Sequence, residues 1–422
     1  MQKKLLTLAV AGALGAPGVA LAQSSAEVYG TINMSFGNVK WGASTQGAPS
    51  LAKWDVAQHA SNYGVRGRES IGGGLTAWFQ IETNTPMERS GNIAITPASR
   101  NSAVGVQGDF GNVFIGQWTS PWADLDALWA IGTVGGWGPV TSIIGRRETT
   151  GTAPNANCVN VPTSGGVTPG TAGGAVPCDA LEGGGGIGHA FWRRLSNAAF
   201  YQSPVVNGLQ AKVAYQTNEG RSVANATLAS VASNASLWSI SVQWTGMGGN
   251  ARIGAAYDRH TEFTTKDRAD TGISVKGGYN FGVVDLGLAW EQMTYRSTFG
   301  DCKGSNYGVA LAFPVATGTI RGSWSVAGDL NDPGCFGAAG AQIAINPAGS
   351  LSGNNGATEF NLGYEHRFSK RTQIGVGYAT IRNDADGAHN WTGLPPNQGG
   401  AVNAPARGSS ISTWFVNMIH RF

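Results

Sequence analysis

Residues Trp238-Ser-Ile-Ser-Val-Gln-Trp244 alternate large apolar side chains with small polar ones without a break. Successive side chains of a β-strand point to opposite faces, so this segment has one apolar face and one polar face. The apolar face begins and ends with tryptophan, which is typical of a strand that crosses a membrane between two aromatic girdles. The polar face suits contact with water.

The same period of two recurs along the chain and outnumbers helical patterns. The clearest further examples are residues 75–82, 209–216 and 373–378. A soluble two-sheet domain would also alternate. The aromatic ends of the apolar runs, and polar faces of Gln, Ser, Lys and Gly around a wet lumen, favour an all-β transmembrane antiparallel β-barrel.

The first twenty-two residues are typical of a secretory signal peptide. Lys3 and Lys4 precede a short apolar stretch, and Ala20-Leu-Ala22 offers a cleavage site before Gln23. A single membrane anchor is disfavoured because the apolar stretch is short and polar residues follow it. We therefore expect residues 1–22 to be removed and residues 23–422 to form the barrel.

Composition excludes some function classes. Removing Lys3 and Lys4 from the 28 basic residues leaves a net charge of +1 against 25 acidic ones, which is no footprint for binding nucleic acid. Charged residues make up 13% of the chain, well below the roughly 25% of ordinary soluble proteins. This composition fits a protein with much of its surface in lipid.

Short and long connections alternate between the expected strands, as in bacterial outer-membrane barrels with short periplasmic turns and longer external loops. The short turns are expected at 71–74, 108–112, 203–208, 246–250, 281–284, 313–318 and 369–371. The long loops are expected near 37–57, 87–98, 119–190, 218–235, 261–269, 297–303, 329–356 and 384–408. Seven turns and eight loops join sixteen strands, enough to enclose a water-filled channel. Eighteen strands remain possible if a long loop contains a hairpin.

Within the longest connection, Ala127 to Gly145 is uncharged and could be mistaken for a membrane helix. Its glycines and Pro139 disfavour a helix, so we expect a folded loop. In an exported chain, four cysteines indicate disulfides. We expect the pairs Cys158–Cys178 and Cys302–Cys335, although the sequence permits three connectivities.

Three segments carry a family resemblance: residues 62–82, residues 100–116 and the C-terminal run Trp414–Phe422, which ends in phenylalanine. They resemble the Gram-negative trimeric general (diffusion) porins, particularly the β-proteobacterial branch, and so does the region around Arg194. The chain departs from many relatives in having His420 two residues before its end, and in the length of the 119–190 segment.

The resemblance implies a homotrimer in which the third external loop, residues 119–190, folds into the lumen and narrows it. It also implies a ladder of wall arginines facing loop carboxylates. Residue by residue, Arg66, Arg100 and Arg194 match basic wall positions, and Arg68 shares the strand face of Arg66. Asn62 stands where some relatives have arginine. The candidate acidic residues on the loop are Asp124, Asp126 and Glu148.

Physical chemistry supports a lumen position for these arginines, since a charge facing lipid costs about 2–4 kcal/mol at the midplane. They could instead be ordinary solvated lumen residues, or residues at a subunit interface. Because residues 127–145 supply no carboxylate, we expect a modest anion preference that weakens at high salt. Small residues such as Gly64, Ser102, Ala103 and Gly105 suggest close subunit packing.

No catalytic constellation appears. The six histidines lack metal-ligand spacing, and Gly183–Gly186 lacks the lysine of a phosphate loop. We expect no enzyme activity, no cofactor and no metal. The expected partners are two further copies of the chain, outer-membrane lipid including lipopolysaccharide, and small hydrophilic solutes and ions. The alternative is a barrel with its lumen plugged by residues 119–190, acting as an adhesin or structural surface protein.

Overall fold

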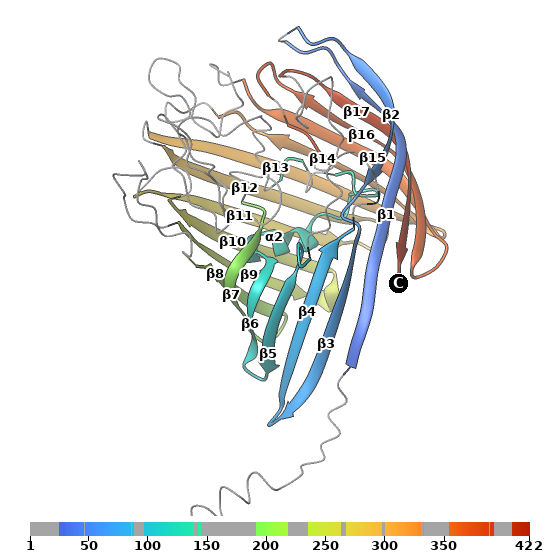
Figure 1. The fold of residues 1–422 in the computed structure, drawn as a ribbon. Coiled ribbons are helices and arrows are strands. Elements are labelled where there is room, and N and C mark those ends of the chain that lie inside the picture. The colour runs from blue at the N-terminus through green and yellow to red at the C-terminus, as the bar shows by residue number, and fades with distance from the viewer. Residues whose placement is uncertain are drawn as a thin grey trace, which may run out of the picture.

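The computed structural model describes residues 25–45, 47–85, 87, 97–138, 142–144, 191–217, 235–262, 267–297, 300–330, 332, 354–387, 389–391 and 407–422. They form one antiparallel sheet that closes on itself (Figure 1). The first strands are β1 (Ser25–Trp41), β2 (Leu51–Gln58), β3 (Asn62–Gly72), β4 (Leu75–Asn84), β5 (Ser102–Gly108), β6 (Gly111–Thr119), β7 (Arg194–Gln202), β8 (Leu209–Gln216) and β9 (Ser236–Gly246). The remainder are β10 (Ala251–Thr261), β11 (Ala269–Asn280), β12 (Asp285–Ser297), β13 (Gly300–Val315), β14 (Gly318–Ala327), β15 (Ala357–Arg367), β16 (Thr372–Asn383) and β17 (Ile411–Arg421).

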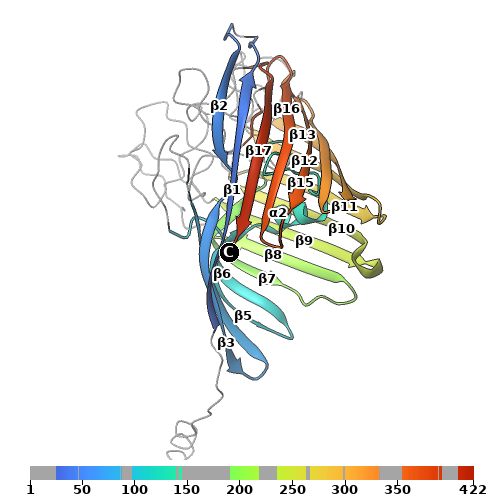
Figure 2. The same ribbon diagram turned by 90° about the vertical axis from the view of Figure 1, so that its right-hand side faces the viewer.

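The barrel closes where the last strand meets the first. β17 pairs with β1 from Thr31↔Arg421 to Trp41↔Ile411, and both views show the two strands side by side (Figures 1 and 2). The predicted membrane barrel is therefore confirmed. Among the described residues, no helix is long and apolar enough to span a membrane.

The seventeen strands make a sixteen-stranded barrel, because β2 and β3 follow one another along the same edge of β1 and together form one barrel strand. β2 pairs with the Met34–Trp41 half of β1, and β3 pairs with its Ser25–Thr31 half. Between them the chain kinks at Ala60, whose φ is +51°. Ser61 bridges the kink, since its hydroxyl accepts from the Asn33 backbone N–H at 3.0 Å. The prediction of sixteen strands is confirmed.

All seven predicted short turns connect strands in the structure. Two predicted long loops are wrong in extent. The 37–57 loop is shorter than predicted, because β1 continues to Trp41 and β2 begins at Leu51. In the second, β12 extends to Ser297 and β13 begins at Gly300, so most of the predicted 297–303 loop is strand. Cys302 accordingly lies in β13, opposite Tyr295, rather than in a loop.

Side chains alternate between lipid and lumen on every strand. In β10, for example, Ile253 and Tyr257 point outward and are about half exposed, whereas Ala256 and Asp258 point inward and are buried. The inward residues are buried because the 120–144 segment packs against them. This alternation places apolar side chains in lipid and polar ones toward the channel.

Gly64, Ala103 and Gly105, three of the four small residues expected at a subunit contact, face the lumen instead. The fourth, Ser102, accepts a hydrogen bond from the Glu82 backbone N–H at 3.0 Å. A Cβ on Gly64 would lie 2.7 Å from the Tyr29 hydroxyl, and one on Gly105 would lie 2.8 Å from the Trp78 ring. Ala103 packs in the same lumen cluster as Trp78. These residues make room for inward aromatic side chains, so they cannot form a contact between barrels.

Candidate functional site

The connection after β6 enters the barrel and follows its inner wall. It begins with α2 (Pro121–Asp124), whose N-cap is Ser120, and continues as the 3₁₀ turn η1 (Leu125–Leu128). The Ser120 hydroxyl accepts a hydrogen bond from the Ala123 N–H at 3.2 Å, and Pro121 presets the first helical turn. Figure 1 shows α2 within the ring of strands. The expectation that Ala127 to Gly145 is a folded loop holds for its described residues, 127–138 and 142–144.

Two carboxylates at the start of this segment bind lysines on the wall. Asp124 Oδ2 accepts from Lys212 Nζ on β8 at 3.0 Å, and Asp126 Oδ1 accepts from Lys276 Nζ on β11 at 2.7 Å. Lys276 is also 3.7 Å from Glu291 Oε2 on β12. Burial raises the pKa of Asp124, and the ammonium of Lys212 opposes that shift. These pairs fix the start of the segment to one side of the lumen.

Two wall arginines hold backbone carbonyls of the segment. Arg252 Nε donates to the Leu128 carbonyl at 2.6 Å, and Arg321 Nη1 donates to the Ile131 carbonyl. Each guanidinium is also paired with a wall carboxylate, Arg252 with Asp285 at 2.6 Å and Arg321 with Glu365 at 2.8 Å. Both arginines therefore carry a counter-charge and leave no net charge beside the segment.

Aromatic side chains complete the packing of the segment. Trp129 is fully buried against β13, where a Cβ on Gly308 would lie 2.6 Å from its ring. Trp137 packs against Phe415 and Trp391, with ring centroids 5.6 and 5.2 Å away. Burial of these two indole rings against the barrel wall stabilises the loop in this position. The described part of the segment therefore runs along the wall from β8 to β17.

Beyond these contacts, Ser142 donates to Glu359 on β15, and Trp391 Nε1 donates to the other carboxylate oxygen at 3.0 Å. Glu359 thus ties the 120–144 segment to the last long connection of the barrel. Glu359 was not among the residues predicted for the site. It stands next to Phe360 on a predicted strand, so the alternation of side chains could have indicated that Glu359 points inward.

The predicted wall arginines lie on the other side of the lumen. Arg66 pairs with Glu27 on β1, and its guanidinium lies 4.8 Å from the ring centroid of Tyr29. Tyr29 in turn donates to Glu82 Oε2 at 2.9 Å, and Glu82 Oε1 accepts from Arg100 Nε at 2.5 Å. The chain of contacts joins Arg66 to Arg100 across β3, β1 and β4, and Arg100 lies just before β5.

Arg194 continues this row. Its Nε donates to Asn101 Oδ1 at 3.0 Å, immediately beside Arg100. The structure therefore brings Arg66, Arg100 and Arg194 onto one connected stretch of wall. It does not bring Asp124 or Asp126 against them, because both carboxylates bind lysines. Glu148, Cys158, Cys178 and Cys335 lie outside the described residues. Cys302 is disulfide-bonded, and its partner also lies outside them.

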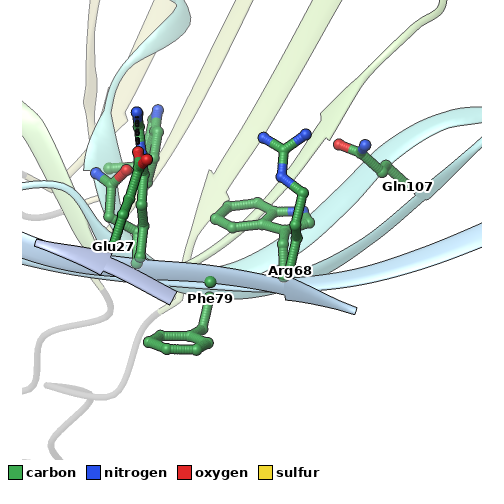
Figure 3. Close-up of a pocket in the computed structure, with 9 residues that line it drawn as sticks. Glu27, Arg68, Phe79 and Gln107 are labelled. Atoms are coloured by element: carbon green, nitrogen blue, oxygen red, sulfur yellow. Dashed lines mark hydrogen bonds and ion pairs between the residues drawn. The ribbon is translucent and has the colours of Figure 1, made fainter. Parts of the chain in front are cut away.

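Arg68 differs from the other candidates. Within the described ranges, its guanidinium has no hydrogen-bond or ion-pair partner. It lines a cavity of about 360 Å³ together with Glu27, Arg66, Trp78, Gln80, Gln107 and Trp118. Figure 3 shows Glu27, Arg68 and Gln107 pointing to one side of the sheet, while Phe79 points to the other. Arg66 and Arg68 share a lumen face, as their spacing predicts.

The wall partners Glu27, Tyr29 and Glu82 were not anticipated as part of the site. Glu82 stands on the polar face of the predicted strand 75–82, so its inward direction was predictable. Its choice of Arg100 as a partner was not, because that contact depends on how the chain returns from the loop after β4.

Comparison with known proteins agrees with this architecture. A family model described as "Gram-negative porin" matches residues 7–386. Outer membrane porin protein 32 of Delftia acidovorans is 25% identical over 402 residues, covering 91% of this chain and 90% of the relative. An outer membrane porin protein of Bordetella pertussis is 24% identical over 408 residues, covering 89% and 92%.

Solved structures show the same fold. The anion-selective porin from Comamonas acidovorans has a TM-score of 0.65 at 20% identity, covering 95% of this chain and 100% of that one. The trimer form of OmpT from Vibrio cholerae has a TM-score of 0.52 at 12% identity, covering 94% and 99%. The closed barrel, the loop inside it and the family match lead to one conclusion: the chain belongs to the Gram-negative porin family and forms a multi-pass β-barrel channel in the outer membrane.

Proposed function

We propose that this porin lets small hydrophilic solutes and ions diffuse through its lumen with a modest preference for anions. The observation that carries the proposal is the unpaired guanidinium of Arg68, within the described part of the chain, in a water-accessible lumen cavity. A fixed positive charge between low-dielectric walls raises the local concentration of passing anions.

The charges around this cavity sum to a positive value. Glu27 and Arg66 form an ion pair and cancel, Gln80 and Gln107 are neutral, and Arg68 remains. On the opposite wall, Lys212, Lys276, Arg252 and Arg321 each bind at least one carboxylate. Among these lumen cations, the one without a carboxylate partner in the described ranges is therefore Arg68, on the β3 side.

The narrowest part of the channel is proposed to lie between the 120–144 segment and the row formed by Arg66, Arg100 and Arg194. The support is that the segment is held against β8–β17 by ion pairs and buried indoles, which leaves the row facing the remaining passage. Glu82 neutralises Arg100, so this row contributes less positive charge than three free arginines would.

Association into a homotrimer is part of the proposal. The outer face of β2, β1 and β17 carries an exposed apolar row in which Asn38 lies between Trp54 and Trp414, both 69% exposed. Phe36 stacks on Trp54 at 5.2 Å. A contiguous apolar face of this kind suits contact with a second barrel. OmpT of Vibrio cholerae has been solved in a trimer form.

The assembly is tested by native mass measurement in mild detergent. We expect trimers for the wild type and for Trp324→Arg, and monomers for Trp54→Arg. Both tryptophans are exposed on the outer face, so the control introduces the same charge elsewhere on the barrel. Only monomers in the wild type would refute the trimer.

The channel itself is tested by planar-bilayer recording of the wild-type protein. We expect stepwise conductance. In a KCl gradient, we expect the sign of the reversal potential to show a preference for chloride. The magnitude of the reversal potential should decrease toward 1 M salt, where the Debye length is about 3 Å. Absence of conductance steps would instead support a plugged lumen and a role at the cell surface.

A further inference from the structure

Amide side chains line the lumen wall near the short turns. This amide row runs across five neighbouring strands, β5 to β9, and consists of Gln107, Asn112, Gln202, Gln210 and Gln243. Gln107 lies opposite Asn112 in the register, and Asn112 lies opposite Gln202. The row points inward because the alternate residues beside it point outward and are each more than a third exposed: Val113, Tyr201, Leu209 and Val242.

Part of the amide row is available to bind another molecule. Gln243 Nε2 donates to Gln210 Oε1 at 3.2 Å, and Asn112 Oδ1 accepts from Trp78 Nε1 at 2.8 Å. Among the described residues, the carboxamides of Gln107 and Gln202 form no hydrogen bond. A carboxamide both donates and accepts hydrogen bonds, as a hydroxyl does. The row is therefore suited to a ligand that carries several hydroxyl groups.

Gln107 belongs to two adjoining cavities on this wall. The cavity of about 360 Å³ that contains Arg68 and Trp78 is the first. The second, of about 310 Å³, is lined by Asn112 and Gln202. Binding sites for small molecules commonly have volumes of about 300–1,000 Å³. Each cavity is thus large enough for a small solute, and together they connect Arg68 with the amide row.

Trp78 provides a flat apolar surface in the first cavity. Its ring lies against β5, where a Cβ on Gly105 would be 2.8 Å from the ring carbon Cε2. The hydrogen bond to Asn112 fixes the orientation of the indole. The rings of Phe114 and Trp118 support it, with centroids 5.3 and 5.7 Å away. A rigid indole of this kind can bury the C–H face of a sugar ring.

One charged group completes the site. Arg68 lies opposite Trp78 in the register, and it has no ion-pair partner in the described part of the chain. Arg68 and Gln107 point to the same side of the sheet (Figure 3). A guanidinium group binds a carboxylate through two parallel hydrogen bonds. The wall therefore combines one anion-binding group, neutral amides and a flat apolar surface.

We propose that this wall binds a sugar acid, a pyranose with one carboxylate such as a hexuronate, during its passage through the lumen. Arg68 binds the carboxylate, Gln107 pairs with ring hydroxyls, and Trp78 packs against the C–H face. A neutral sugar lacks the contact with Arg68, and a small carboxylate lacks those with Gln107 and Trp78. The inference rests on the proposed function only in that solutes enter the lumen.

The test measures binding by saturation-transfer difference NMR, which detects weak ligands, on the whole protein in a detergent without a sugar headgroup. The probes are glucuronate, glucose and acetate, and titration of each gives a Kd. The variants are Arg68→Gln and Gln107→Ala. The control is Gln292→Ala, which removes an exposed carboxamide from the outer face of β12, because the neighbouring Glu291 and Met293 are buried on the lumen side.

We expect the wild type to bind glucuronate at least about tenfold more tightly than glucose or acetate, because only glucuronate makes both the charged and the neutral contacts. Arg68→Gln should weaken glucuronate binding at least about tenfold and leave glucose binding unchanged. Gln107→Ala should weaken glucuronate binding about fivefold, the effect of one lost hydrogen bond, and leave acetate binding unchanged. The control should bind all three probes like the wild type.

Three results would overturn the proposal. Equal binding of acetate and glucuronate would show that the wall recognises charge alone. Equal binding of glucose and glucuronate would show that Arg68 takes no part. Wild-type affinity of Gln107→Ala for glucuronate would show that the amide row does not contact the ligand.

Channel recordings separate this inference from the proposed function. Gln107→Ala changes no charge, so its reversal potential in a KCl gradient should match that of the wild type while its affinity for glucuronate falls. A wild-type channel that prefers chloride but binds no glucuronate would overturn this inference alone. Selective glucuronate binding by a channel without chloride preference would overturn the selectivity proposal and leave the sugar-acid site standing.

Discussion

Arg100 and Glu82 form an ion pair on the lumen wall, with Arg100 Nε 2.5 Å from Glu82 Oε1. Both side chains are less than one-fifth exposed, and Tyr29 donates a further hydrogen bond to the same carboxylate. The pair means that a wall arginine is neutralised by the wall itself. Charge selectivity in this channel therefore depends on which partner each arginine has.

Substitutions within this pair should have opposite effects on selectivity. Glu82→Gln removes the negative charge beside Arg100, so we expect the reversal potential to move further toward chloride. Arg100→Gln leaves Glu82 uncompensated, so we expect movement toward potassium. Both are measured in the same KCl gradient, and movement in one direction for both variants would show that the pair does not face the ion path.

Loss of Lys276 should loosen the loop within the barrel. Lys276→Met leaves Asp126 and Glu291 without their cation, and breaking a buried pair in this way costs about 3–5 kcal/mol. We expect faster proteolysis within residues 119–190 and a red shift of tryptophan emission, since Trp122 and Trp129 are fully buried.

The matched control for Lys276 is Lys40→Met, which removes an exposed outward lysine from β1. It should leave both proteolysis and emission unchanged. Wild-type behaviour of Lys276→Met would show that the indoles alone hold the segment.

Acidification should increase anion preference partly through Asp124. Burial raises the pKa of this carboxyl above its ordinary 3.8, so it takes up a proton before an exposed aspartate does as the pH falls. The neutral form leaves Lys212 as an uncompensated cation. The same shift affects stability. Because the pKa of Asp124 is higher in the folded chain than in the unfolded chain, protonation stabilises the folded state at pH values below the unfolded-chain pKa. This stabilisation is lost as the pH rises through the folded-chain pKa.

The pH experiment compares the wild type with Asp124→Asn from pH 7 downward. At pH 7 the variant should be the more anion-selective of the two. As the pH falls, the two reversal potentials should converge. The pH at which they converge should lie above the ordinary aspartate pKa of 3.8. Parallel curves with no convergence would show that Asp124 does not titrate in contact with the ion path.

Cys302 is buried in β13 and disulfide-bonded, so it cannot be a free thiol. Peptide mapping without reduction should show Cys302 joined to Cys335, and Cys158 joined to Cys178. A membrane-impermeant alkylating reagent should modify none of the four without reductant. Any other pairing would contradict the prediction.

Much of the fold was predictable because the alternation of side chains and the turn residues are local signals. The seven short turns and the inward direction of Arg66, Arg68 and Glu82 all follow from local sequence. The kink at Ala60 was not predictable, since an alanine with positive φ gives no sequence signal. The extension of β12 to Ser297 and of β13 back to Gly300 was missed, because a glycine-containing stretch of this kind suits a loop as well as the end of a strand.

The site was predicted less completely because its partners come together through long-range packing. The sequence identifies Asp124 and Asp126 as loop carboxylates, but their pairing with Lys212 and Lys276 depends on the side of the lumen that the loop follows. That side is selected by the fit of Trp129 beside Gly308 and by Arg252 and Arg321. Around Gly64 and Gly105, the small residues show no alternation of apolar and polar side chains. The sequence therefore did not indicate that these positions face the lumen.

The proposed anion preference depends above all on the unpaired charge of Arg68. The most direct measurement is the reversal potential of Arg68→Gln in a KCl gradient at low ionic strength. Arg259→Gln serves as the control, because it removes the same charge from the lipid side of the wall. We predict that Arg68→Gln shifts the reversal potential toward potassium while Arg259→Gln retains the wild-type value. An unchanged reversal potential in Arg68→Gln would contradict the account.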